Sequence, residues 1–425
     1  MNGSSSDGSG ADGVSAVTRQ RAEDACTIMQ AALGALCDSK DASCPLPTRQ
    51  QVAAAVQLVR TEVAKMGLVY NQAAAAGAAP TSGGGAASTS GGGAAPTSAS
   101  SAPSDAEAEA LLQGLQQAVC TLCMVYMGIA ASDSAGPTLR ASLDQTATAA
   151  VESCVALVRG AVLGGARDAQ LMMLSGFCLE MLEAAEKAPL DSRTAIGRAI
   201  TQVLKQLADA AKELEEEVQA AAEAAEEGGD EEAAAATTAA AGSDADSDAG
   251  FGLFTAEAFS AGQLAVARRV QRLLAAVLGV AKSVVKLLLA EREGLSPEAV
   301  EGWESMLYHI KGLGPVVDDL SAATYPPQDA QELASAAEAL ATSCELLRDE
   351  CPAAGAASSS GGGGDGAQQQ AEEGGAAAPA AALLPPLEAV QAAHRELAAE
   401  LASAAAGEAA ASAAAAAAAE HGEGQ

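Results

Sequence analysis

Aliphatic residues recur at intervals of three and four positions along most of this 425-residue chain. That interval matches the 3.6-residue turn of an α-helix, so each such segment has one apolar stripe that must be buried against another element. The clearest stripe consists of Val52, Val56, Val59, Val63 and Met66. Aromatic residues, on which sheets normally draw together with β-branched residues, make up only 2% of the chain. The sequence therefore predicts an all-α fold.

About ten segments of this kind, most of them joined by short connections, are typical of antiparallel helical bundles. We expect two bundles, an N-terminal one over residues 14–227 and a C-terminal one over residues 250–406. The stretch 228–249 is acidic, rich in Ala and without an apolar stripe. It is therefore predicted to be the linker between the bundles.

Four further stretches are predicted to be disordered, because their composition cannot bury enough apolar surface to offset the loss of chain entropy. Two of them, at 73–103 and 352–382, are insertions rich in Ala, Gly and Ser within the predicted bundles. The other two are the ends of the chain, residues 1–13 and 407–425.

The formal net charge of the chain is −32. A field of this sign repels phosphate backbones, so we expect no nucleic-acid partner, and it steers the protein toward basic proteins. We also expect no membrane segment, because Lys282 and Lys286 interrupt the most apolar stretch, Arg272–Ala290. The first thirteen residues are rich in Ser, Gly and Asp and do not have the pattern of a secretory signal, which predicts an intracellular protein.

The residues that carry catalysis or bind metals are sparse. The chain has three histidines, none of which has a set of ligands at helical spacing, and its Gly runs match no nucleotide-binding loop. Cys120 and Cys123 form a lone CxxC within a helical segment, where we expect them to pack as small apolar residues. We therefore predict no enzyme, cofactor or metal site, and the alternative is a thiol or metal protein that uses these two cysteines.

One basic surface is predicted on the helix expected over residues 255–292. At about 100° per residue, Arg268, Arg272, Lys282 and Lys286 fall on one side of this helix, opposite its apolar stripe. We call these four residues the basic ridge. The ridge is either an ordinary solvated face or a docking surface for an acidic partner or an acidic segment of the same chain.

A second candidate site lies between two predicted helices. It consists of Val317-Asp318-Asp319-Leu320, four intervening residues and Tyr325-Pro326-Pro327. Taken by itself, the pattern indicates a helix end, because the residue before a proline is disfavoured in the α region. The pattern also resembles a signature of the cyclin-D-binding protein family, called GCIP or Maid, the Grap2-and-cyclin-D-interacting proteins. Looser similarities extend upstream, at Phe177–Glu180 and Pro189–Asp191.

The resemblance implies a helical, two-domain protein that binds D-type cyclins and helix-loop-helix factors. It also implies that the protein restrains cell-cycle entry and moves between cytoplasm and nucleus. The alternative function is a helical adaptor or scaffold similar to vinculin and α-catenin, with no cyclin partner.

Overall fold

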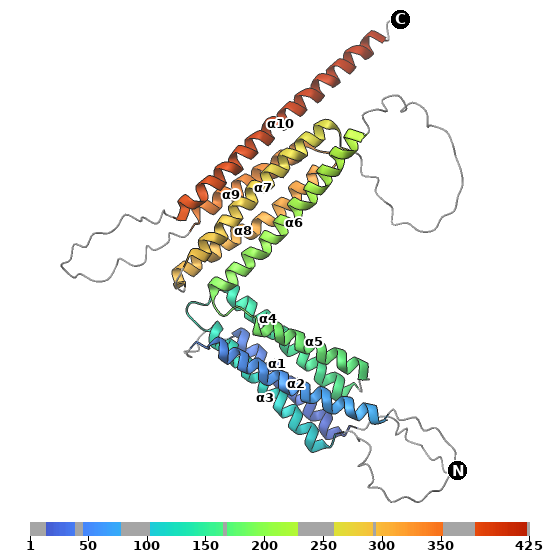
Figure 1. Ribbon diagram of the computed structural model, residues 1–425, viewed down its shortest axis with the longest axis vertical. Helices are drawn as coiled ribbons and strands as arrows, with labels where there is room; N and C mark the ends of the chain where they lie inside the picture. Colours follow the sequence, from blue (N-terminus) through green and yellow to red (C-terminus); the bar gives the residue numbers. More distant parts are fainter. Residues whose placement is uncertain are drawn as a thin grey trace, which may run out of the picture. The chain divides into compact units, whose positions relative to one another are not determined.

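The computed structural model describes residues 14–38, 46–77, 103–164, 168–227, 259–291, 295–351 and 379–422. These residues form ten α-helices and one short π-helix, and none of them is in a β-strand. The predicted all-α fold is therefore confirmed (Figure 1). The chain divides into two compact units, Met1–Ala195 and Ile196–Gln425, each built around a core of its own.

The described part of the first unit is a bundle of five α-helices with a single π-helical turn. Its elements are α1 (Ala16–Asp38), α2 (Arg49–Gly77), α3 (Asp105–Ala130), α4 (Pro137–Val158), η1 (Arg159–Leu163) and α5 (Asp168–Glu186). Ser104 begins α3 with a capping box, because its hydroxyl accepts from the Glu107 N–H while the Glu107 carboxylate accepts from the Ser104 N–H. Gly136 begins α4, with Pro137 in the first helical turn, where its missing N–H has no helical partner to lose.

Most neighbouring helices of the first unit are antiparallel. In the first half of α2, Arg60 pairs with Glu186 at the end of α5, and further along α2 Gly67 lies against Ser175. Helices α1 and α3 instead run parallel. Their starts lie side by side, since Thr18 near the start of α1 donates a hydrogen bond of 2.6 Å to Asp105 at the start of α3. The bundle is thus mainly, though not wholly, antiparallel.

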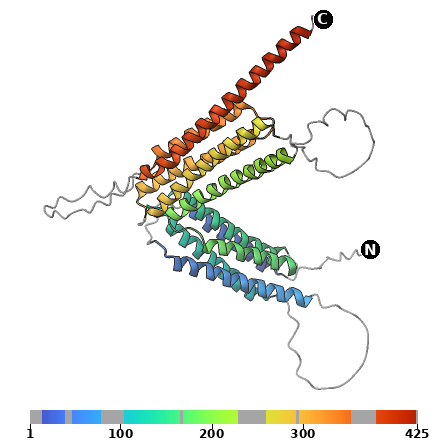
Figure 2. The ribbon, with the colours of Figure 1, turned by 45° about the horizontal axis from the view of Figure 1, so that its top comes forward.

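In the second unit, too, the residues that the structure describes form a bundle of five helices. They are α6 (Ser192–Glu227), α7 (Ala261–Ala290), α8 (Pro297–Thr324), α9 (Ala330–Asp349) and α10 (Pro379–Gly422). Figure 2 shows α6, α8 and α10 alongside α7 and α9. Trp303, the single tryptophan of the chain, is buried in this core. Pro315 lies inside α8, which continues to Thr324.

The boundary between the cores differs from the predicted one by one helix. The apolar stripe of α6 belongs to the core of the second unit, and it consists of Ile196, Ile200, Val203, Leu207, Leu214 and Val218. The packing boundary is therefore at 195/196, whereas the N-terminal bundle was expected to continue to residue 227. A stripe shows which face of a helix is buried but not which core receives it, so the packing of α6 does not follow from the break in composition after it.

Three of the predicted disordered stretches, 73–103, 352–382 and 407–425, overlap helices. Helix α2 continues to Gly77, and α10 begins at Pro379 and continues to Gly422, through most of the predicted disordered tail. The tail is rich in Ala, which has the highest helix propensity, so it is helical although the last buried side chain of α10 is Leu401. Residues 1–13, 78–102, 228–249 and 352–378, also predicted to be disordered or a linker, lie outside the described residues.

Three stretches among the described residues are long and apolar enough to cross a membrane by length and composition alone. They are α3, α4 with η1 (Pro137–Leu163), and α7. Between 39% and 56% of the most apolar 18-residue segment of each helix is buried inside the bundles. Part of the apolar surface of these helices is therefore buried in the two cores.

Candidate interaction surfaces

The first half of the predicted signature lies on the last turns of α8 and is divided between core and surface. Val317 and Leu320 are buried in the second core, whereas Asp318 and Asp319 are exposed. The two aliphatic residues are three positions apart and so share the buried face of the helix. The signature therefore has a structural part and an accessible acidic part.

The second half of the signature forms the corner between α8 and α9. Tyr325 has an extended backbone, and it and Pro326 are partly buried, while Pro327 is exposed. Burial raises the pKa of Tyr325, and the nearby carboxylates of Glu213 and Glu217 in α6 raise it further. The phenol therefore remains protonated at neutral pH, with its ring near α6.

The residue after the signature secures this corner. The side-chain amide of Gln328 donates to the carbonyl of Thr324 at 2.6 Å and to the carbonyl of Gln263 at 3.1 Å. These bonds join the end of α8 to the start of α7 and satisfy a terminal carbonyl of α8. Asp329 then caps α9 by accepting from the N–H groups of Gln331 and Glu332.

An open groove of about 610 Å³ runs between α8 and α9 beside the signature. Asp319 of the signature lines it, together with Asp329, Glu332, Ser335 and Ala336. Three carboxylates in the lining, one from α8 and two from the start of α9, favour a cationic group of a partner, such as the guanidinium of an arginine. Sequence reasoning did not identify the groove, because Asp329 and Glu332 belong to α9 and come close to Asp319 only through the α8–α9 corner.

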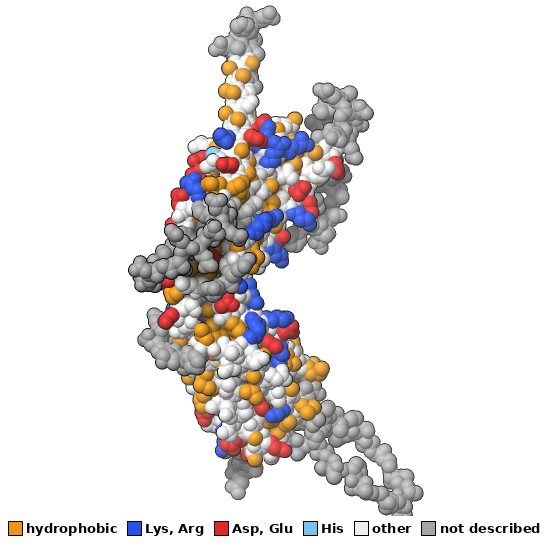
Figure 3. Space-filling model, turned by 60° about the vertical axis from the view of Figure 1, so that its left-hand side comes forward, with side chains coloured by type: hydrophobic (Ala, Val, Ile, Leu, Met, Phe, Trp, Pro, Cys, Tyr) orange, Lys and Arg blue, Asp and Glu red, His pale blue; other side chains and the backbone are white. Residues whose placement is uncertain are grey.

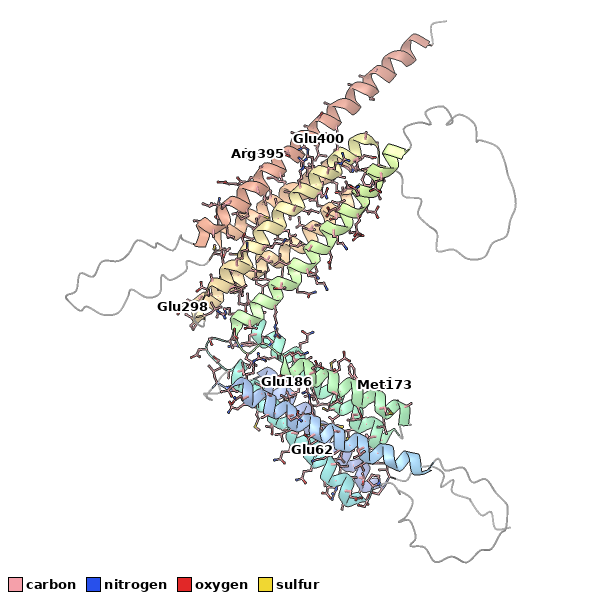
Figure 4. The ribbon with its side chains drawn as sticks, in the orientation of Figure 1. Glu62, Met173, Glu186, Glu298, Arg395 and Glu400 are labelled. Carbon is pink, nitrogen blue, oxygen red and sulfur yellow. The ribbon has the colours of Figure 1, made fainter. Side chains whose placement is uncertain are left out.

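The four residues of the basic ridge are exposed on α7. Arg272 is 3.3 Å from the carboxylate of Glu396 in α10. Arg269, which was not predicted, lies closer to the same carboxylate, at 2.5 Å, and also pairs with Glu400 at 3.7 Å. Figure 4 labels Glu400 where α10 passes α7. One member of the ridge, Arg272, therefore contacts an acidic segment of the same chain.

The other three members of the ridge differ from Arg272. Among the described residues, Arg268, Lys282 and Lys286 have no ion-pair partner. Figure 3 shows Lys and Arg side chains recurring along the visible face of the second unit. Most of the ridge is thus a solvated basic surface.

A third surface, on α5, was not predicted as a site. Met172, Met173 and Phe177 are 65%, 66% and 50% exposed, and Leu179 is also exposed. We call these four residues the α5 face; Figure 4 labels Met173 on it. Leu68 of α2 is exposed as well, next to the Gly67 that packs against α5. Large apolar residues gathered in this way on a surface mark sites of interaction.

The sequence contained a signal for this surface. Between residues 171 and 179, seven positions are Leu, Met, Phe or Cys, which is more than one buried stripe can hold. The core takes only Leu171 and Cys178 fully. Apolar residues around most of a helix circumference therefore indicated that some of them would be exposed.

The cysteines predicted to be core residues lie within α3. Cys123 is buried and Cys120 is partly buried, and burial raises the pKa of the Cys120 thiol. A raised pKa lowers the fraction of reactive thiolate at neutral pH. Within the described ranges, no group of three or more His, Cys, Asp or Glu side chains is arranged to hold a metal ion.

Sequence models of one protein family match most of the chain. The model described as Grap2 and cyclin-D-interacting, N-terminal, matches residues 51–220, and its C-terminal counterpart matches residues 241–349. The chain belongs to the Grap2 and cyclin-D-interacting protein family. The resemblance predicted from residues 317–327 is thereby confirmed. No curated protein matches the chain.

The two family matches also show which helices belong to which half of the family. The matches are separated between residues 220 and 241, so in sequence α6 belongs to the N-terminal half of the family, although its stripe packs in the second core. The α5 face lies inside the N-terminal match, and the signature lies inside the C-terminal match. Helices α1 and α10 lie outside both matches.

Proposed function

We propose that this member of the Grap2 and cyclin-D-interacting protein family binds a D-type cyclin through its α5 face and thereby restrains cell-cycle progression. The proposal includes action in both cytoplasm and nucleus, by binding rather than by catalysis. The observation that carries it is the exposure of Met172, Met173 and Phe177 on one helix. The family description supports the choice of partner.

The physical basis is the apolar area that a partner removes from water. Complete burial of a Met or Phe side chain contributes roughly 1.5–3 kcal/mol, so these three side chains suffice as the anchors of an interface. Methionine side chains are unbranched and polarisable, and they adapt to the surface that they contact. The α5 face is therefore suited to a protein partner.

The test is a binding measurement on the purified full-length chain. A D-type cyclin is immobilised, and the affinity of the wild-type chain is compared with that of a Met172→Ser, Met173→Ser, Phe177→Ser variant. We expect the triple variant to bind at least tenfold more weakly. The matched control is Leu289→Ser with Tyr308→Ser, because these side chains are 69% and 75% exposed on the second unit. We expect this control to bind like the wild type.

Other outcomes distinguish the alternatives. A wild-type chain that does not bind the cyclin contradicts the proposal. An equal loss of affinity in the triple variant and the control removes the α5 face as the site. A helix-loop-helix factor and filamentous actin are measured in parallel, and binding to actin alone favours the adaptor function.

A further inference from the structure

Helix α10 covers a surface made by α7 and α9 at one side of the second unit (Figure 2). Its buried stripe is short and consists of Leu383, Leu387, Val390, Leu397 and Leu401. Most of the intervening residues are alanine or polar, and the described side chains after Leu401 are mainly exposed. The segment that packs is therefore a single amphipathic helix of about five turns.

Polar contacts on the α7 side of this helix are selective for negative charge. Glu396 accepts from Arg269 at 2.5 Å and from Arg272 at 3.3 Å, and Glu400 lies 3.7 Å from Arg269. Two arginines beside the apolar surface attract a carboxylate and repel a cation at the same position. This side of the surface therefore recognises an acidic helix flank.

Contacts on the α9 side have the opposite preference. Glu345 accepts from the side-chain amide of Gln391 at 2.9 Å, and Glu338 lies 3.2 Å from the imidazole of His394. Two carboxylates on this side favour a hydrogen-bond donor or a cation. Together the two sides fix both the orientation and the rotation of the helix that occupies the surface.

Helix α10 joins the second core through its five aliphatic side chains, and its polar contacts lie at or near the surface. The hydrogen bonds of Glu396 and Glu345 are solvent-exposed, whereas His394 and Glu400 are partly buried, and ion pairs at the surface contribute little to stability. By contrast α8 places Trp303, Met306 and Ile310 fully in the core. Helix α7, which α10 covers, is the most apolar of the three helices that are long enough to span a membrane. Removal of α10 would therefore uncover an apolar surface without removing the aromatic centre of the core.

We infer that the surface of α7 and α9 beneath α10 is a binding site for an amphipathic helix of a partner protein, and that α10 is its resident occupant. The partner helix has aliphatic residues at the α10 spacing, carboxylates that face Arg269 and Arg272, and donors that face Glu338 and Glu345. The partner helix would make the same contacts with α7 and α9 that α10 makes. This inference is independent of the cyclin proposal, because it concerns another unit and another surface.

The experiment uses the full-length chain and a fluorescent peptide of residues 379–405. In the chain, Glu396→Arg places a cation against Arg269 and Arg272 and so weakens the resident helix. The matched control is Glu388→Arg, because Glu388 is exposed on the same helix and has no ion-pair partner among the described residues. We expect the peptide to bind the Glu396→Arg chain at least tenfold more tightly than the wild-type or Glu388→Arg chain.

Three further peptides test the recognition chemistry. A peptide that itself carries Glu396→Arg should lose most of its affinity for the Glu396→Arg chain, because the arginines of α7 now repel it. A designed Ala/Gln helix with the five aliphatic residues, two glutamates, glutamine and histidine of α10 at their natural spacing should bind, and a scrambled version should not. Binding of the designed helix shows that the pattern suffices for a partner.

Three results overturn the inference. If the Glu396→Arg chain is folded but binds the peptide no better than the Glu388→Arg chain, α10 is a fixed part of the bundle. If the Glu396→Arg change abolishes the cooperative unfolding reported by Trp303 fluorescence, α10 is an integral core helix. If sedimentation shows that the variant pairs with itself through α10, the occupant is a second copy rather than a partner protein.

Discussion

The division of the signature between core and surface predicts that its buried and its exposed residues differ in their effect on the stability of the second unit. Leu320 is completely buried, so Leu320→Ala removes its contacts and leaves a cavity in the second core. Substitutions of this kind cost about 2–5 kcal/mol. For a unit of 150–250 residues, about 3 kcal/mol lowers the melting temperature by roughly 6–12 °C.

Trp303 makes this prediction measurable for one unit at a time. It is the only tryptophan, and it lies in the same core as Leu320, so its fluorescence reports the unfolding of the second unit. Thermal unfolding is followed by Trp303 fluorescence and, for the whole chain, by far-ultraviolet circular dichroism. Leu320→Ala should shift the fluorescence transition and leave unchanged the part of the dichroism transition that comes from the first unit.

The control is the exposed half of the same signature. Asp318→Asn with Asp319→Asn should change the stability of the second unit by no more than about 0.5 kcal/mol per substitution, because both side chains are exposed on α8. The reasoning is refuted if the aspartate variant shifts the Trp303 transition as far as Leu320→Ala does. It is also refuted if Leu320→Ala leaves that transition in place.

Three further predictions concern the first unit. Tyr126→Phe should lower its free energy of unfolding by about 1 kcal/mol in urea, because the buried hydroxyl donates to the carbonyl of Ala185 at 2.6 Å. Hydrogen bonds from Thr18 and Ser15 lower the pKa of Asp105 in the folded state. Their contribution to the free energy of unfolding is therefore present at neutral pH and is lost as the pH falls through the lowered pKa. Asp105→Asn should therefore be less stable than the wild type at pH 7, and acid titration should show the difference shrinking below the ordinary aspartate pKa. Burial raises the pKa of the Cys120 thiol, so iodoacetamide should alkylate Cys120 more slowly at pH 7 than it alkylates a free thiol. Mass spectrometry measures the rate of this alkylation. A rate as high as that of a free thiol would support the alternative of a thiol protein.

Two of the candidate surfaces show why local patterns find a site only in part. The basic ridge was predicted from helical spacing, and all four of its residues are exposed. Spacing along one helix carries no information about a neighbouring helix, so it did not reveal that Arg269 and Arg272 face Glu396. The acidic groove likewise depends on two helices that meet at a corner. The pairs between α7 and α10 join residues more than a hundred positions apart. The groove joins residues across a turn whose direction the sequence pattern does not determine.

The sequence by itself determined that this protein is helical, which face of most helices is buried, and the family to which the chain belongs. These properties depend on the spacing of apolar residues and on short motifs, which act within a few turns of one helix. Only the tertiary structure decided that α6 packs in the second core, that the α5 face stays exposed and that α10 covers α7. An apolar stripe gains the same free energy against any complementary surface, so its partner is chosen by the packing of the whole bundle.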